Sequence, residues 1–308
     1  MGRYVLRRLL QLIPVFIGTT FIIYALVWAV PGDPFAGKCG ERACPPSYVA
    51  EMTARYNLDD PLIVQYFKYL GQLFTGNFGE TYAGVQISDL IANAYPTTVR
   101  LAIVALLIEA VIGVLAGILT GLRGKGFLDS LVLISTLFLI SLPVFVTGFL
   151  LKVWLGTELG LIKTSVGSDP SIGELLVPGF VLGSLSMAYV ARLTRTSMME
   201  NKRADYVRTA TAKGLKPNRV VGVHLLRNSL IPVITFLGTD LGALMGGAIV
   251  TEGVFNIRGI GGLVYKAILT KEGMTVTGIV TLLVLVYLLM NLLVDVLYAV
   301  LDPRIRYD

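Results

Sequence analysis

The side chains that could do chemistry are few in this 308-residue sequence. Its single histidine, His224, stands in a basic segment, where a surface position near lipid headgroups is the simplest interpretation. One histidine excludes a multi-histidine metal site and leaves a histidine-dependent nucleophile without a credible triad. Neither a Gly-x-Ser-x-Gly elbow nor a GxxxxGK[ST] phosphate loop occurs. We therefore expect no metal site, no directly bound cofactor and no enzymatic activity.

Acidic residues inside apolar segments are the second place to look. Glu109, Asp240 and Asp295 each lie in a strongly apolar stretch, where a charge costs about 2.5–3.5 kcal/mol on insertion scales. Such residues can line a polar translocation path, or they can form an interhelical hydrogen bond or lie near the interface. Both interpretations stay open for Asp240, whereas the position of Asp295 near the end of its stretch favours the second. Scattered acids without basic partners argue against a proton or sodium relay.

Two cysteines, Cys39 and Cys44, follow the first apolar stretch. Four residues separate them, and a loop of that length can be closed by a disulfide. An extracytoplasmic compartment is oxidising enough to keep such a bond. The alternative is two unpaired thiols, because a metal site would need more ligands.

The elements that position these residues are membrane helices. The chain is 55% hydrophobic and 15% charged, with a mean hydropathy of +0.74. Soluble domains are roughly 45–50% apolar and about 25% charged, and a membrane-spanning helix needs about 20 apolar residues. We therefore predict an all-α membrane protein. Six stretches qualify as spans: 9–30, 99–122, 128–151, 175–193, 229–253 and 276–300.

The lysine and arginine residues predict the orientation of the chain in the membrane, because short loops on the cytoplasmic side carry an excess of basic residues. Six spans with both termini inside place the majority of the 26 basic residues on that side. They include Arg3, Arg7, Arg8, Arg123, Lys125, nine residues between Arg192 and Arg227, Arg304 and Arg306. The positive charge follows the ends of spans, which argues against a nucleic-acid partner. The expected location is the cell membrane.

Three segments follow from this layout. Residues 1–30 form the cytoplasmic amino terminus and the first span, and a turn at 30–34 ends it. Residues 31–97 form an extracytoplasmic insertion, in which 47–57 and 61–75 have helical apolar spacing. These helices could lie on the membrane surface or cover the bundle. Residues 98–308 form a core of five spans with a cytoplasmic loop at 194–228.

The most informative part of that loop is 205–215, a short charged segment rich in small residues. Gly214 is a natural helix stop, and Pro217 follows it closely. Small residues at 209–212 leave room for a partner to approach the backbone. The alternative is a helix that lies on lipid headgroups. The segment contains Asp205, Tyr206, Arg208, Thr209, Ala210, Ala212, Lys213, Gly214 and Leu215.

The sequence of this loop resembles the cytoplasmic loop of permease subunits of ABC importers. The resembling motif is Asp-Tyr-Val-Arg-Thr-Ala-x-Ala-Lys-Gly-Leu at 205–215, followed by His-x-x-x-Arg-Asn-x-x-x-Pro at 224–232. The similarity is specifically to the first permease of dipeptide, oligopeptide and nickel systems. Further matches include Pro-Gly-Asp-Pro at 31–34, Asn-Phe-Gly at 77–79, Pro-x-Thr at 96–98, Glu-x-Val-Phe at 252–255 and Asp-Pro-Arg at 302–304.

The resemblance implies a type I importer fold and a set of partners. These are a homologous second permease, two ATPase subunits that bind ATP and Mg, an extracytoplasmic solute-binding protein, a peptide substrate and the lipid bilayer. It assigns to 205–215 the role of a coupling helix that docks on an ATPase subunit. Candidate path or gate residues are Asp240, Glu252, Phe255, Gly259 and Gly261.

Two departures from the family pattern affect these expectations. The general signature has Glu-Ala-Ala where Arg208-Thr-Ala210 stands, so an acidic contact is not carried over. Relatives have proline at the position of Arg258 and Asp-x-Pro at 272–274, so the delivered substrate is in doubt. A nickel chelate, haem or an oligosaccharide are alternative substrates. From a different class of protein, the alternative is a stand-alone secondary transporter or channel.

Overall fold

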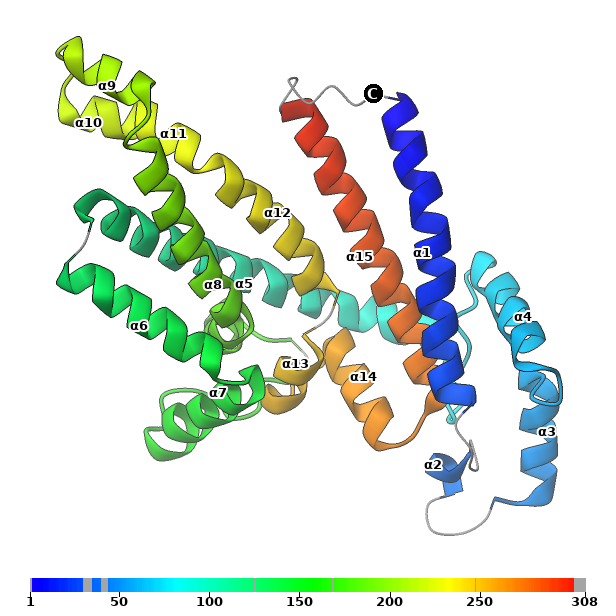
Figure 1. The fold of residues 1–308 in the computed structure, drawn as a ribbon. Helices are drawn as coiled ribbons and strands as arrows, with labels where there is room; N and C mark the ends of the chain where they lie inside the picture. Colours follow the sequence, from blue (N-terminus) through cyan, green and yellow to red (C-terminus); the bar gives the residue numbers. More distant parts are fainter. Residues whose placement is uncertain are drawn as a thin grey trace. The chain divides into compact units, whose positions relative to one another are not determined.

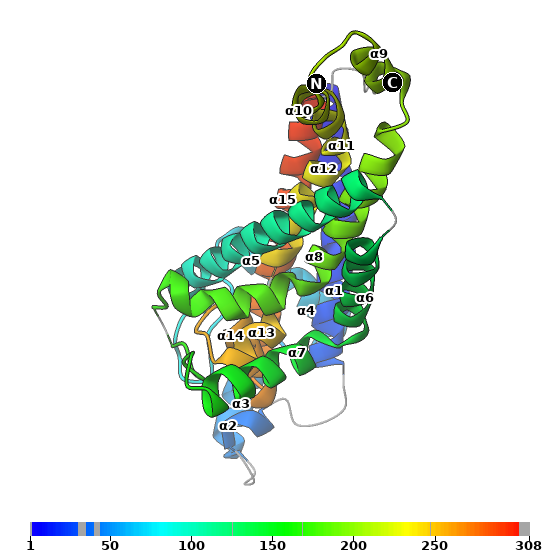
Figure 2. The same ribbon diagram turned by 90° about the vertical axis from the view of Figure 1, so that its left-hand side faces the viewer.

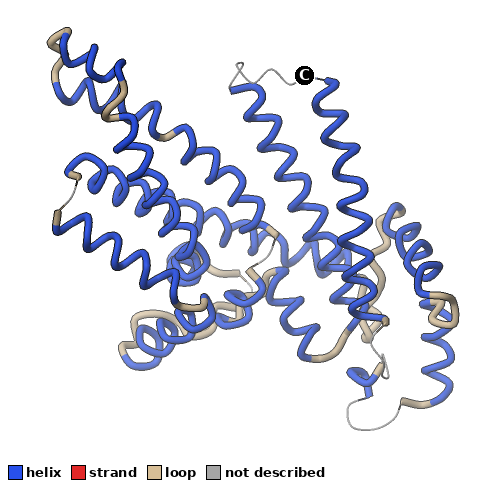
Figure 3. The backbone as a smooth tube through the Cα atoms, in the orientation of Figure 1, coloured by secondary structure: helices blue, strands red, loops and turns tan. Residues whose placement is uncertain are grey.

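The computed structural model describes residues 2–29, 35–39, 44–124, 126–167, 169–246 and 248–301. Most of these residues are helical, and the described ranges contain isolated bridges but no strand (Figure 3). The all-α class is therefore confirmed. The turn expected at 30–34, Lys125 and the basic tail at 302–308 lie outside the described residues.

Within the described residues, four helices are long and apolar enough to cross a membrane (Figure 1). They are α1 (Gly2–Trp28), α5 (Ile87–Arg123), α8 (Ile172–Asn201) and α15 (Gly273–Leu301). Two bent helix pairs raise the number of candidate spans to as many as six. These helices cover the stretches expected at 99–122, 175–193 and 276–300, and α1 covers the stretch expected at 9–30 as far as Trp28.

The third expected stretch, 128–151, is a broken helix. It consists of α6 (Phe127–Ser141), α7 (Val144–Leu151) and the π-helical segment η1 (Lys152–Glu158), with a bend of 101° at the break. Pro143 explains the break, because proline disfavours the helical conformation in the residue before it. Leu142 accordingly has an extended backbone, with φ −92° and ψ 128°.

The fifth expected stretch, 229–253, is also divided. A continuous helical stretch made of α10 (Pro217–Arg219), η2 (Val220–Leu225) and α11 (Leu226–Ser229) leads into it. This stretch meets α12 (Ile231–Met245) at a bend of 45°. The helix ends at Met245, and α13 (Ile249–Phe255) is separate. Glu252 therefore lies in α13, beyond the end of the candidate span.

Contacts divide the chain into two compact units. Unit 1 comprises residues 1–99, 167–169 and 245–308, and unit 2 comprises residues 100–166 and 170–244. In unit 1 the start of α5 packs on α14 (Ile260–Leu269) and α15. The buried side chains of this core are Ile87, Ala94, Ile260, Val264, Met274, Ile279 and Leu283.

In unit 2 a line of glycines brings α5 and α8 together. Gly113, Gly117 and Gly121 recur every four residues on one face of α5 and lie against α8. A Cβ atom added at Gly117 would meet Thr194 Cβ at 2.4 Å. Glycines at this spacing let two membrane helices approach closely. We call this contact the glycine seam.

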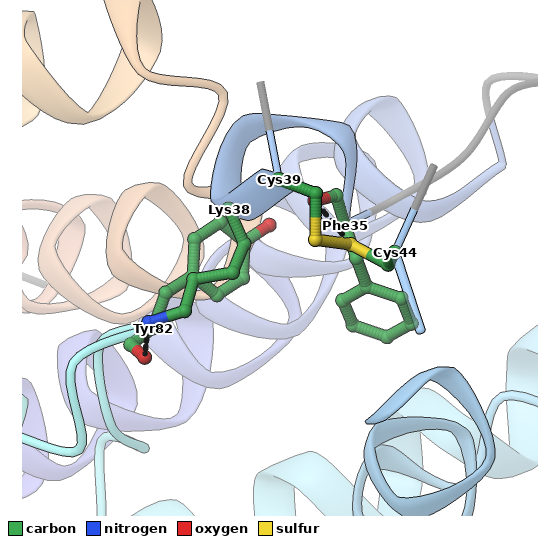
Figure 4. The surroundings of a disulfide bond; sticks show 5 residues. All are labelled: Phe35, Lys38, Cys39, Cys44 and Tyr82. Atoms are coloured by element: carbon green, nitrogen blue, oxygen red, sulfur yellow. Dashed lines mark hydrogen bonds between the residues drawn. A yellow bond between two sulfur atoms is a disulfide. The ribbon is translucent and has the colours of Figure 1, made fainter. Parts of the chain in front are cut away.

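The stretch expected to form the insertion, 31–97, contains α2 (Ala36–Cys39), α3 (Pro46–Tyr56) and α4 (Leu62–Phe74). The bounds of α3 and α4 agree to within one residue with the helices expected at 47–57 and 61–75. Cys39 and Cys44 are joined by a disulfide with a Cα–Cα distance of 5.3 Å (Figure 4). Beside it, Lys38 Nζ donates a hydrogen bond of 2.7 Å to the carbonyl of Tyr82.

Candidate functional site

The segment 205–215 forms a short helix followed by a turn. Helix α9 (Asp205–Ala212) begins with an acidic residue, which the positive end of the helix dipole favours. It ends just before Gly214, whose φ of +74° is a conformation that favours glycine. Pro217 then starts α10. The chain thus makes a compact helical hairpin after α8 (Figure 2).

One face of α9 is held by the protein's own core. Val207 and Ala210 are buried with Met198 of α8 and with Val220 and Leu225 of η2. Partly buried side chains of Ile118 and Leu122 of α5 extend this cluster. We call it the hairpin core. It fixes α9 to the ends of α5 and α8.

The opposite face of α9 is exposed. Asp205 and Arg208 are 97% and 73% exposed and interact with each other at 3.8 Å, an arrangement that leaves both groups accessible to a partner. Leu215 is partly buried. The remaining exposed residues of the expected docking segment are Tyr206, Thr209, Ala212, Lys213 and Gly214.

Ala210 differs from the expectation. Its small side chain had been placed on the face that a partner would approach, but only 5% of the residue is exposed. It packs inward beneath α9. The approachable face is therefore defined by residues on either side of Ala210 in the sequence, chiefly Thr209 and Ala212.

A second arrangement, in unit 1, is built around Glu252 of α13. This carboxylate is fully buried. Its Oε1 atom accepts a hydrogen bond of 2.8 Å from the hydroxyl of Thr98, and its Oε2 atom accepts one of 2.8 Å from the backbone N–H of Gly262. The hydroxyl oxygen of Thr98 in turn accepts a hydrogen bond of 2.8 Å from the N–H of Ile260. We call this network the Glu252 clasp.

The clasp leaves no space for additional atoms. A Cβ atom added at Gly259 would lie 2.3 Å from Glu252 Oε2, and one at Gly261 would lie 2.7 Å from the backbone nitrogen of Ile249. Burial raises the pKa of Glu252 to about 7, although its hydrogen bonds to Gly262 and Thr98 oppose that shift. The clasp can therefore connect the start of α5 to the α13–α14 hairpin and change its charge near neutral pH.

The other expected gate residues are placed differently. Phe255 is fully buried, so it belongs to the core of unit 1 and lines no open surface. Asp240 belongs to unit 2, where its carboxylate lies close to Glu109 of α5 and to Ser186 of α8. The Oδ2 atom of Asp240 and both carboxylate oxygens of Glu109 are buried without a hydrogen-bond partner in the described part of the chain.

Sequence reasoning missed several of these relationships. Thr98 belongs to the Pro-x-Thr motif at 96–98, and nothing in its sequence surroundings indicates a partner 154 residues away. The partly buried ion pair between Arg195 and Asp129 was not expected either. Asp295, by contrast, pairs with Arg8 at 3.4 Å, which supports the structural interpretation of that acid.

Comparison with known protein families covers almost the whole chain. Residues 1–102 match the model described as the N-terminal part of binding-protein-dependent transport system membrane components. Residues 113–307 match the model described as the binding-protein-dependent transport system inner membrane component.

Curated relatives agree along their full lengths. A di/tripeptide transport system permease of Pseudomonas aeruginosa is 37% identical over 334 residues, with 99% of each chain covered. An oligopeptide transport system permease of Haemophilus influenzae is 36% identical over 313 residues, with 100% of each chain covered. A dipeptide transport system permease of Escherichia coli K12 is 32% identical over 337 residues, covering 100% of this chain and 99% of the relative.

These matches and the apolar helices show a multi-pass protein of the cell membrane. The chain belongs to the family of binding-protein-dependent transport system inner membrane components.

Proposed function

We propose that this chain is the permease subunit of an ATP-driven importer of di- or oligopeptides and forms half of its translocation pathway. The full-length similarity to three peptide permeases supports this assignment. The second half of the pathway would come from a homologous permease. A solute-binding protein would deliver the peptide from outside, and two ATPase subunits would supply the energy.

The proposed topology has six spans with both termini in the cytoplasm. In this arrangement α6 with α7, and α11 with α12, each make one bent span. The α9 hairpin then lies on the cytoplasmic side, and the insertion with α3 and α4 lies outside. The concentration of basic residues around α9 supports this orientation.

The coupling role is assigned to α9, and one observation carries it. The helix is fixed to α5 and α8 by the hairpin core, while its charged face remains exposed. A helix that is rigidly attached on one side and free on the other can transmit the movement of a docked partner. We propose that Arg208 contacts an acidic group of the ATPase subunit.

Candidate elements of the pathway are assigned within each unit. In unit 2, Asp240 of α12 would provide a polar group along the path. In unit 1, the Glu252 clasp with Gly259 and Gly261 would fix the α13–α14 hairpin as an outer gate. Phe255 would support that hairpin from the core.

Charge reversal on the exposed face tests the coupling proposal. We expect Arg208→Glu to reduce copurification of the ATPase subunits and to abolish most vanadate-sensitive peptide uptake in proteoliposomes. Arg219→Glu is the matched control, because Arg219 is an exposed arginine of the adjacent helix α10 outside the proposed docking face. The control should behave like the unmodified protein.

Two results would contradict the proposal in different ways. If Arg208→Glu kept both ATPase binding and uptake, α9 would not be the coupling element. If peptide uptake by the unmodified protein needed no ATPase subunit, the chain would be a secondary transporter or a channel.

A further inference from the structure

Helix α4 of the insertion has two apolar faces. Tyr66, Tyr69 and Leu70 on one face are buried in a cluster with Tyr24 of α1. A second face beside it is exposed to a large extent, and we call it the α4 stripe. It consists of Ile63, Val64, Phe67 and Phe74, with exposed fractions of 60%, 42%, 58% and 86%.

The contacts of the buried face of α4 show how far from the end of α1 the helix is positioned. The rings of Tyr66 and Phe21 are 5.2 Å apart, and those of Tyr69 and Tyr24 are 5.3 Å apart. Phe21 and Tyr24 precede Trp28, where α1 ends, by seven and four residues. At a rise of 1.5 Å per residue, α4 therefore contacts α1 roughly 6–10 Å inside its end.

Hydrogen bonds from α4 reach further inside the candidate spans. The hydroxyl of Tyr66 bonds to Thr20 Oγ1 at 2.7 Å and donates to the carbonyl of Ile17 at 2.8 Å. The hydroxyl of Tyr69 donates to Thr281 Oγ1 at 3.1 Å. Thr281 follows Gly273, the first residue of α15, by eight residues, or about 12 Å of helix.

The end of α1 and the beginning of α15 lie at the same level. A Cβ atom added at Gly273 would lie 2.7 Å from a side-chain atom of Val27, so the beginning of α15 is beside the end of α1. The hydrocarbon core of a bilayer is about 30 Å thick. One leaflet is therefore about 15 Å deep. The ring contacts and the Tyr69–Thr281 bond fall within that depth, and the Tyr66–Ile17 bond, about 16 Å from Trp28, reaches the centre of the bilayer. Figure 1 shows α4 beside the half of α1 that ends at Trp28.

The polar groups of this region are compatible with that depth. The hydroxyls of Tyr66 and Tyr69 are satisfied by protein groups, as the absence of water in the hydrocarbon requires. Lys68, the charged residue of α4, pairs with Asp60 at 2.5 Å. Its long side chain can keep the charge near the interface while its methylene groups stay in an apolar environment.

We propose that the α4 stripe contacts the lipid acyl chains of the leaflet on the Trp28 side. Helix α4 is then a partly inserted membrane helix that lies against α1 and α15, and not a water-facing cover. In the proposed topology this is the outer leaflet. The inference does not depend on peptide transport, because it follows from the position of α4 along two spans.

The test uses the full chain in the assembled transporter, reconstituted in lipid nanodiscs. A spin label is attached at Phe67→Cys, and its collisions with oxygen and with a water-soluble nickel chelate are measured. Leu26→Cys serves as the lipid reference, because Leu26 is 68% exposed near the end of α1. Glu51→Cys, at an exposed position of α3, serves as the aqueous reference.

We expect oxygen to relax the spin label at position 67 more strongly than the nickel chelate does, as it should at the lipid reference position 26. At the aqueous reference position 51, the nickel chelate should relax the label more strongly than oxygen. Val64→Cys, on the same stripe, should repeat the result and protects the test against a folding defect at one position. Nickel-dominated relaxation at both stripe positions would show a water-facing or binding-protein surface. Shielding from both reagents would show a second permease on the stripe. Either outcome would overturn the proposal.

Discussion

The α9 hairpin and the α13–α14 hairpin use acidic residues in opposite ways. In α9, Asp205 is almost completely exposed, and apolar contacts of Val207 and Ala210 hold the helix. In the second hairpin, Glu252 is fully buried, and its hydrogen bonds hold the structure. The comparison distinguishes an exposed charged surface, which is free to bind a partner, from a buried carboxylate whose hydrogen bonds are all made within the protein.

Removing the buried carboxylate should have the largest effect. Glu252→Ala leaves the hydroxyl of Thr98 and the N–H of Gly262 without an acceptor. Each unsatisfied buried donor costs about 1–3 kcal/mol, so we expect a loss of about 4 kcal/mol and a clearly lower Tm of the purified complex. Glu51→Ala, at an exposed acid of α3, is the matched control. Equal Tm values for the two variants would show that the clasp does not stabilise unit 1.

Glutamate introduced at two positions of α9 should distinguish its buried face from its exposed face. Ala210→Glu forces a charged side chain into the hairpin core, and we expect a loss of about 3 kcal/mol from overpacking and burial. Ala212→Glu adds the same side chain to the exposed face and should change stability by less than about 0.5 kcal/mol. Thermal unfolding and ATPase copurification distinguish the two effects. If Ala212→Glu unfolded the hairpin as strongly, the assignment of faces would be wrong.

A smaller effect is expected from pH. The pKa of Glu252 is about 7 in the folded protein and about 4.3 in an unfolded chain. The folded state therefore binds the proton more tightly, so this stabilising contribution is complete below the unfolded pKa and is lost as the pH rises through 7. Between pH 5 and 7 the loss should be about 2 kcal/mol. Glu252→Gln cannot ionise, so its Tm should depend less on pH over this range. An identical dependence of Tm on pH for the unmodified protein and for Glu252→Gln would contradict the raised pKa of Glu252.

The sequence predicted the helices better than the contacts between them. Apolar stretches locate α1, α5, α8 and α15, and helical spacing locates α3 and α4. The break before Pro143 was visible in principle, because proline restricts the residue that precedes it. Apolar composition alone could not reveal the bend, since both halves of the stretch are strongly hydrophobic.

The candidate site was predicted in part. Gly214 and Pro217 correctly indicated the end of α9, and the apolar pair Val207 and Ala210, three residues apart, carried a signal for the buried face. The Glu252 clasp could not be predicted, because Thr98 and Glu252 are far apart in sequence and no local pattern connects them. Such a pairing depends on how helices pack in three dimensions.

The glycine seam has a mechanical consequence. Because α5 and α8 interlock through Gly113, Gly117 and Gly121, they cannot slide past each other without a steric clash. The hairpin core attaches α9 to the ends of both helices. In the proposed coupling role, a displacement of α9 would therefore move α5 and α8 together, because side chains of both helices pack against α9.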